Sequence, residues 1–223
     1  MKDNLKIDFY RHLSLSAVGG FFAAYAMLCH TDMLANAQTM NLLSLTIGIL
    51  DGNPMAVLLH LGSLLLYVVG TMLTVLLPHY LKLNIRILVP IVDIVTAIVL
   101  SVMPKGINGF LALYPIFFAM SMQWSAFSGA RGYISSSIFS TNNTKQASLA
   151  LARYITAGDR QQISKMIFYI CTLLCFHIGA TCSYYAVKAY GTRGAWLNIP
   201  LILISLTVIL KEEKMSKPQK AEV

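Results

Sequence analysis

Apolar residues gather in six long stretches along the chain, and polar segments separate these stretches. They are residues 13–29, 56–77, 87–103, 110–127, 166–187 and 195–210. Each has about the length that an α-helix needs to cross a hydrocarbon core of roughly 30 Å, once helix tilt is allowed. The pattern therefore predicts an all-α, polytopic transmembrane bundle of about six spans, built as a single membrane domain over residues 1–223.

Two shorter apolar runs, at residues 42–50 and 147–155, recur in similar surroundings. Each follows a Thr-x-Asn element and precedes a turn that contains Gly and Asp. Three features in the same order predict two related halves, at about residues 12–104 and 107–210. Because each half holds an odd number of spans, the second would lie upside down relative to the first, as in many secondary transporters.

The two short runs leave several architectures open. They fit re-entrant segments, which a membrane tolerates where polar backbone faces a cavity or other protein, and they also fit interfacial helices. A chance recurrence of Thr-x-Asn is the simplest alternative. An eight-span protein in which both runs cross is the other, although it sorts the cationic residues less well.

Lysine and arginine residues are divided unequally between the segments that join the six stretches. In the six-span arrangement fourteen of the seventeen lie on one side: Lys2, Lys6, Arg11, Lys82, Arg86, Arg131, Lys145, Arg153, Arg160, Lys165, Lys211, Lys214, Lys217 and Lys220. The other side holds Lys105, Lys188 and Arg193. The positive-inside rule then places both chain ends in the cytoplasm.

Composition supports a membrane protein and argues against a nucleic-acid partner. Hydrophobic residues make up 57% of the chain and charged residues 12%, where a soluble domain has about 25% charged residues. The net charge of +8 comes from cations in segments beside the spans, without the clustered basic face that phosphate binding requires. The lipid bilayer is the expected partner. The tail, residues 211–223, mixes lysine with glutamate and is expected to be disordered.

The first stretch and the segment after it resemble a known family. A glycine-rich span at residues 19–25 precedes Ala-Asn-Ala-Gln-Thr-Met-Asn at residues 35–41. This resembles the N-terminal signature of the YoaK-like family of bacterial integral membrane proteins, which has no established function and commonly carries Ala-Asn-x-Thr-Gly-Asn. The second half of that family often has Thr-Gly-Asn, similar to residues 141–143, and a polar, Gln-containing stretch near Gln123. The resemblance implies an inner-membrane helical protein.

The chain departs from that pattern at both central glycines, which are replaced by Met40 and Asn142. If the glycine supplies a left-handed turn, asparagine can adopt that conformation and methionine cannot easily do so. The first Thr-x-Asn element is then expected to be more helical than in the family.

Asp93 is the strongest single candidate for a functional residue, because it interrupts the apolar stretch 87–103. A charged side chain near the bilayer centre costs about 2.5–3.5 kcal/mol even on insertion scales. The carboxyl group is therefore expected to be paired, solvated in a cavity or protonated. It is either a cation or proton site, or a structural group bonded to a neighbour such as Thr96.

Other polar residues are weaker candidates. The candidates for substrate or ion binding are Asn36, Gln38, Thr39, Asn41, Thr141, Asn142, Asn143, Gln123 and Arg131. The asparagine and threonine residues could instead cap the following short helices, and Arg131 could reach Asp93, an anionic ligand or the lipid headgroups. His60 and His177 are candidates for a proton relay, or for helix-to-helix hydrogen bonds.

These features favour a small secondary transporter or permease of a small polar or ionic solute, with Asp93 as the coupling or substrate carboxylate. A chain this short could need a homodimer to enclose a path. The alternative is a non-transporting membrane scaffold or accessory subunit. We expect no enzyme activity, because HExxH, GxSxG and Walker motifs are absent from the sequence. No cofactor or metal is expected, because the four cysteines form no CxxC pair.

Overall fold

The computed structural model describes residues 4–30, 33–104 and 106–216, and most of this length is helical. The helices are α1 (Asn4–Cys29), α2 (Thr39–Leu50), α3 (Pro54–Leu81), α4 (Ile85–Val102), α5 (Tyr114–Ala126), α6 (Thr141–Ala157), α7 (Gln161–Tyr190) and α8 (Ile199–Ser216). Short 3-10 helices η1 (Leu111–Leu113) and η2 (Gly191–Asn198) precede α5 and α8. Strand β1 (Gly129–Ala130) pairs antiparallel with β2 (Tyr133–Ile134). The predicted all-α class is confirmed.

Long apolar helices indicate a membrane protein. Within the described residues, four continuous helical stretches are long and apolar enough to cross a membrane: Lys6–Cys29, Pro54–Leu81, Ile85–Val102 and Gln161–Ser216. The last of these contains α7, η2 and α8. Each of the six predicted apolar stretches overlaps a helix, but α5 has only 13 residues. The number of spans therefore stays a prediction.

The α2–α3 and α6–α7 pairs form helical hairpins, and local sequence explains their turns. Gly52 (φ +62°) and Gly158 (φ +66°) take the left-handed conformation that lets the chain reverse. The Asn53 side chain then accepts a hydrogen bond from Ala56 N at 3.1 Å and begins α3. In the second turn, hydrogen bonds from the Gln162 side chain and the Gln161 backbone lower the pKa of Asp159.

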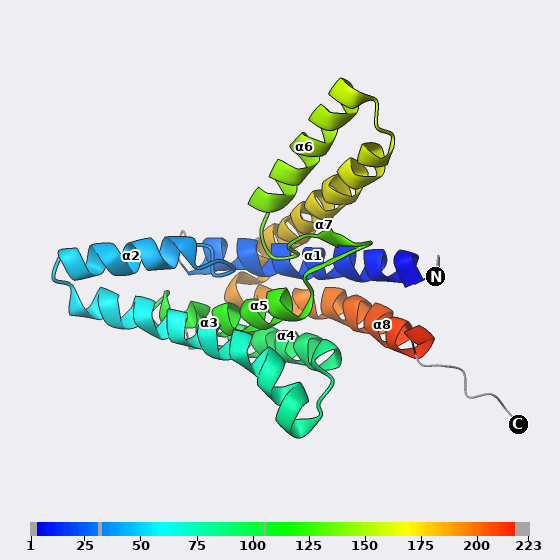
Figure 1. Cartoon of the computed structure of the whole chain (residues 1–223). Helices are drawn as coiled ribbons and strands as arrows, with labels where there is room; N and C mark the ends of the chain where they lie inside the picture. The colour runs from blue at the N-terminus through cyan, green and yellow to red at the C-terminus, as the bar shows by residue number, and fades with distance from the viewer. Residues whose placement is uncertain (1–3, 31–32, 105, 217–223) are drawn as a thin grey trace, which may run out of the picture.

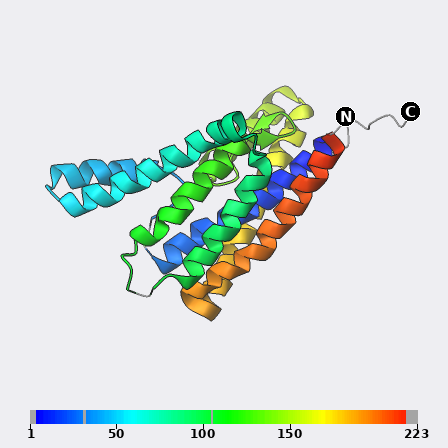
Figure 2. The ribbon, with the colours of Figure 1, turned by 90° about the horizontal axis from the view of Figure 1, so that it is seen from below.

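The interior of the bundle is formed by α1, α4, α5 and α8 (Figures 1 and 2). Its main hydrophobic cluster includes Phe22 of α1, Leu100 of α4, Phe117 of α5 and Ile202 of α8. The beginning of α1 and the end of α8 lie at the same end of the bundle (Figure 1). We call this the terminal end, and the opposite end, where η2 lies, the η2 end. The charge pattern predicts that both termini lie on one side of the membrane, and their orientation stays a prediction.

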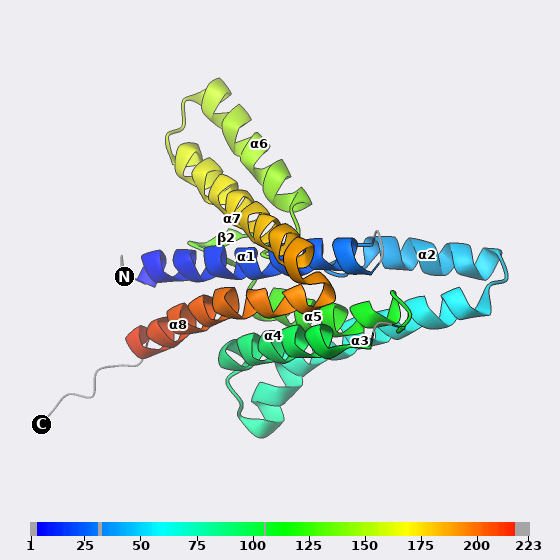
Figure 3. The ribbon, with the colours of Figure 1, turned by 180° about the vertical axis from the view of Figure 1, so that it is seen from behind.

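The two hairpins extend from the bundle in different directions (Figures 1 and 3). In the first half of the chain, α3 packs against α2 and also against α5. In the second half, α7 packs against α6 and also against α1. Likewise, α1 packs against α8, and α5 packs against α4. Each helix of the first four therefore has a counterpart among the last four: α1 corresponds to α5, α2 to α6, α3 to α7 and α4 to α8. When every helix is replaced by its counterpart, each of these packing contacts becomes another contact of the same set.

Glycines allow the closest of these helix crossings. A Cβ atom at Gly20 would meet the backbone of Phe176, and one at Gly179 would meet the backbone of Ala17, so α1 and α7 touch through their main chains. A Cβ atom at Gly70 of α3 would meet the Ser121 side chain of α5. Small residues permit this approach between membrane helices, where packing replaces the hydrophobic driving force.

Two sequence-based expectations are wrong. The tail is helical as far as Ser216, because Glu212 is buried in ion pairs that hold this turn of α8 against the bundle; residues 217–223 lie outside the described residues, as do Lys2 and Lys105. The left-handed turn that Asn142 could supply does not occur, because Asn142 lies in the first turn of α6, where any side chain fits and glycine is not needed. Met40 lies in the first turn of α2, so the first Thr-x-Asn element is helical, as expected.

Candidate functional site

The chain is not helical at residues 33–38, before α2, or along most of residues 127–140, before α6, and these two segments meet in the protein interior. Asn36 of the first segment is 1% exposed. Its Nδ2 atom donates hydrogen bonds to Gly19 O of α1 and to Ile138 O of the second segment, each at 2.9 Å. A single amide group therefore joins the two segments to the middle of α1.

Gln123, near the end of α5, makes a similar contact one turn along α1. Its Nε2 atom donates to Leu15 O at 3.1 Å and to Ser137 Oγ at 2.9 Å. A backbone carbonyl can only accept a hydrogen bond, so the amide nitrogens of Asn36 and Gln123 are assigned without ambiguity. The remaining atoms, Asn36 Oδ1 and Gln123 Oε1, are thus oxygens that are buried and without a hydrogen bond among the described residues.

A third chain of polar contacts runs from α1 to α6. His12 Nε2 lies 2.8 Å from Ser135 Oγ, which lies 2.8 Å from Asn143 Oδ1. The His12 ring stacks on Phe168 of α7, with ring centroids 5.4 Å apart. We call the following residues the central polar cluster; all are buried: His12, Asn36, Gln123, Ser135, Ser137 and Asn143.

The two asparagines of the Thr-x-Asn elements are saturated with hydrogen bonds. Asn41 Nδ2 donates to Gln38 Oε1 and His60 O, and its Oδ1 lies 2.7 Å from Ser63 Oγ and 2.9 Å from His60 Nδ1. Asn143 Nδ2 donates to Ser136 O at 2.7 Å. The asparagines therefore fix the start of each hairpin and have little capacity left for a ligand.

The neighbouring residues of these elements do not join the cluster. Thr39 and Thr141 are exposed and Asn142 is half-buried. The predicted side-chain caps are also missing, since neither Gln38 nor Ser140 caps its helix through its side chain. The first turns of α2 and α6 are held instead by the buried asparagines.

Asp93 lies in the apolar interior of the bundle and is 0% exposed. One turn before it, Val89 packs with Leu15, Met122 and Ile209; one turn after it, Ala97 belongs to the main hydrophobic cluster. Neither carboxyl oxygen has a hydrogen-bond partner among the described residues, so the predicted bond to Thr96 is not formed. An unpaired buried carboxylate is very costly, so Asp93 must be protonated or bind a cation here.

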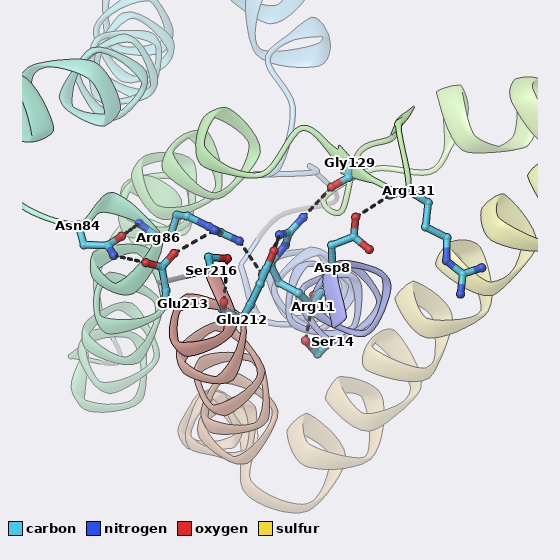
Figure 4. Close-up of polar contacts among 10 residues, drawn as sticks. All are labelled: Asp8, Arg11, Ser14, Asn84, Arg86, Gly129, Arg131, Glu212, Glu213 and Ser216. Carbon is cyan, nitrogen blue, oxygen red and sulfur yellow. Dashed lines mark hydrogen bonds and ion pairs between the residues drawn. The ribbon is translucent and has the colours of Figure 1, made fainter. Parts of the chain in front are cut away.

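A network of ion pairs closes the terminal end (Figure 4). Arg11 Nη1 lies 2.6 Å from Glu212 Oε1, and Arg86 Nη2 lies 2.6 Å from Glu212 Oε2. Arg86 Nη1 also lies 2.9 Å from Glu213 Oε1. We call these four residues the terminal ion network. It ties together the ends of α1, α4 and α8.

The segment after α5 completes this closure. Arg11 Nη2 donates to Gly129 O at 2.8 Å (Figure 4). The guanidinium carbons of Arg11 and Arg86 lie 5.4 and 6.0 Å from the centre of the Phe127 ring, within the range of cation–π attraction. The network therefore holds all four bundle helices, or the segments next to them, together at one end.

Arg131 and His177, two other predicted site residues, lie outside the central polar cluster and the terminal ion network. Arg131 has φ +54°, its backbone N donates to Asp8 Oδ2, and its guanidinium lies 4.0 Å from the centre of the Phe9 ring. It does not pair with Asp93. His177 is exposed on α7, with its ring edge against Phe176. His60 is held by Asn41, as described above, so the two predicted histidines belong to no common relay.

Both ends of the bundle are hollowed. At the terminal end, Asn84 and Glu213 are among the residues that line a cleft of about 520 Å³, and a further cleft lies at the η2 end. This second cleft, of about 640 Å³, is lined by residues that include Ser101, Thr192, Arg193 and Trp196. Below it, the Tyr25 hydroxyl donates to Thr192 O at 2.8 Å and connects α1 to η2.

Sequence reasoning missed His12, Ser135, Ser137 and the terminal ion network. Three consecutive serines at residues 135–137 were a usable signal, since such a run beside an apolar span suggests a buried polar contact. Glu212 carried no such signal. Glu212 belongs to a charged tail, and its partner Arg11 lies 201 residues away in sequence.

A family model described as protein of unknown function, DUF1275, matches residues 12–210. The chain belongs to the DUF1275 family. The match includes Asp93 and the whole central polar cluster, whereas Arg11, Glu212 and Glu213 lie just outside it. The DUF1275 assignment is consistent with the YoaK-like resemblance and supplies no activity. No curated protein and no solved structure matches the chain.

Proposed function

We propose that this DUF1275 protein is a small secondary transporter or permease of a polar or ionic solute in the bacterial inner membrane. The observation that carries the proposal is the meeting of two non-helical segments in the interior, beside buried amide oxygens that lack partners. In transporters, interrupted helices at membrane depth mark binding sites, because irregular backbone is tolerated there only beside a cavity or other protein.

The pairing of the helices supports two inverted halves. In this arrangement α1, α3 and α4 are the spans of the first half, and α5, α7 and α8 those of the second. Helices α2 and α6 are then re-entrant: each begins at a buried asparagine, Asn41 or Asn143, and ends at an exposed hairpin turn. The terminal end, which holds Arg11 and Arg86, faces the cytoplasm.

The chemistry of the interior suits a cation or a solute with hydrogen-bond donors. Asn36 Oδ1 and Gln123 Oε1 can each accept a donor or coordinate a cation. Asp93 supplies a fully buried carboxyl group that has no ion pair and acts as the coupling group. In this proposal the protein has no enzymatic activity, surrounds itself with lipid, forms a homodimer to enclose the path, and needs no nucleic acid, metal or cofactor.

A membrane scaffold or accessory subunit is the second candidate. The saturated hydrogen bonding of Asn41 and Asn143 favours it, because these polar residues already have full structural roles. A scaffold would not depend on the protonation of Asp93.

Sided labelling tests the inverted halves. On a background without the four native cysteines, single cysteines replace Asp51 and Arg160, which are exposed at the tips of the two hairpins. An impermeant thiol reagent is applied to intact cells and to inverted vesicles. We expect Asp51→Cys to react from outside and Arg160→Cys from inside. Labelling of both from one side would contradict the inverted arrangement.

Proton flux tests transport. The protein is reconstituted into liposomes that contain a pH-sensitive dye, and Na⁺, K⁺, amino acids, sugars and organic acids are added singly. We expect at least one class to drive proton movement that empty liposomes lack and that Asp93→Asn abolishes. The matched control Asp51→Asn removes an exposed carboxyl group and should keep the flux. Flux no greater than in empty liposomes would favour the scaffold, and equal flux in Asp93→Asn and wild type would remove Asp93 as the coupling group.

A further inference from the structure

We propose that Asp93 and Glu212 compete for Arg86, so that loss of the Asp93 proton opens the terminal end of the bundle and proton uptake closes it. This inference rests on the proposed transport function and assigns the proton as its coupling ion. It names the terminal ion network as the cytoplasmic gate of the path.

The helical geometry of α4 aligns Arg86 with Asp93. Arg86, Val89 and Asp93 follow each other at intervals of three and four residues, so they share one face of the helix. Seven residues of α-helix span about 10 Å along the axis. The Asp93 side chain leans toward the helix N-terminus, and thus toward Arg86. The same tilt directs the Cβ atom of Arg86 away from Asp93, so Arg86 leaves Glu212 and turns back along the helix to bring the two charges together.

In the closed structure, the two arginines and the two glutamates of the terminal ion network balance each other in charge without Asp93. Glu212 lies within 2.6 Å of both Arg11 and Arg86. Arg86 also pairs with Glu213. A protonated Asp93 adds no charge and can remain between the two hydrophobic clusters. An ionised Asp93 would be a buried anion without a partner, a state that costs several kcal/mol in real proteins.

The charged and titratable groups on the surrounding elements show which cation can pair with an ionised Asp93. They include Tyr114 on α5, Tyr67 on α3 and Arg193 in η2, with Arg11 and His12 on α1, and four groups on α8: the exposed Lys211 and Lys214, with Glu212 and Glu213. Arg193 belongs to the far end, where its backbone carbonyl accepts a long 3.5 Å bond from Ser101. Arg86 is the cation on the face of Asp93, and Arg11 is its neighbour through Glu212.

The sign of the pH response follows from these states. The closed form holds the Asp93 proton, and the open form has released it, so raising the pH favours the open form. When Arg86 turns to Asp93, Glu212 keeps only Arg11, and Glu213 loses its ion pair. Val89, which is buried between Arg86 and Asp93, then becomes accessible to water.

Val89→Cys reports this opening directly. The variant is made without the native cysteines and placed in lipid nanodiscs, where both membrane faces are accessible. Reaction with a hydrophilic maleimide is compared with that of Lys214→Cys, an exposed position that corrects for thiol ionisation. The corrected rate should rise from about pH 5 to about pH 8, by up to about tenfold per pH unit while one proton is coupled to opening.

Two variants separate the proposed proton site from others. With Asp93→Asn the corrected rate should stay low at every pH. With Asp51→Asn, which changes an exposed carboxyl group, the rise should persist. A rise that survives Asp93→Asn, or that disappears with Asp51→Asn, overturns the proposal.

The flux measurement keeps this inference distinct from the transport proposal. Transport with pH-independent labelling of Val89→Cys would leave the transporter in place and remove the proton gate. A pH-dependent opening without flux of any tested solute would keep the gate and remove transport. Elution of each variant as a single species in size-exclusion chromatography shows that labelling reports opening rather than misfolding.

Discussion

Replacing Glu212 by glutamine is expected to be among the most destabilising single changes in the protein. The substitution leaves the buried Arg11 guanidinium without its carboxylate, and breaking a buried ion pair in this way costs about 3–5 kcal/mol. Glu212 is only 8% exposed and also pairs with Arg86. The midpoint of heat-induced loss of the monodisperse peak in detergent should fall clearly below that of the wild type.

Glu213→Gln is the matched control. Glu213 pairs with Arg86 at 2.9 Å, but its side chain is 24% exposed, so we expect a loss of no more than about 1 kcal/mol. A double variant, Arg11→Met with Glu212→Leu, removes both buried charges and should recover much of the stability. Equal midpoints for Glu212→Gln and Glu213→Gln would show that the network does not hold the terminal end.

The helices themselves were predictable because their signal is local. Each apolar stretch is long enough to form a helix wherever it packs, and Gly52 and Gly158 mark the hairpin turns without reference to distant residues. The recurrence of Thr-x-Asn also located the start of α2 and α6. In both cases the third residue, Asn41 or Asn143, turned out to be buried.

The polar contacts were less predictable because their partners are distant in sequence. Asn36 was a candidate on its motif, but its contact with Ile138 joins residues 102 positions apart. Glu212 was counted with the charged tail, where charge usually means solvent exposure, and His12 was not singled out. Asp93 is the exception. A carboxyl group in an apolar run is conspicuous in any sequence, and only its lack of a partner required the structure.

Asn36→Leu is expected to separate the two non-helical segments and to lower stability nearly as much as Glu212→Gln. Its Nδ2 atom is the donor to both Gly19 O and Ile138 O. Leaving a buried acceptor without its donor costs about 1–3 kcal/mol for each group, and leucine cannot replace either bond. The same heat-induced loss of the monodisperse peak measures the effect.

Asn142 provides the matched control for this test. It lies in the second Thr-x-Asn element, whereas Asn36 lies just before the first, but it is only half-buried at the start of α6. Asn142→Leu should change the midpoint little, because substitutions at sites without buried contacts usually stay within about 0.5 kcal/mol. If both variants lose stability equally, the Asn36 amide does not join the segments. If Asn36→Leu alone is unstable, the two halves of the protein are held together where the proposed solute site lies, and transport must proceed without breaking that contact.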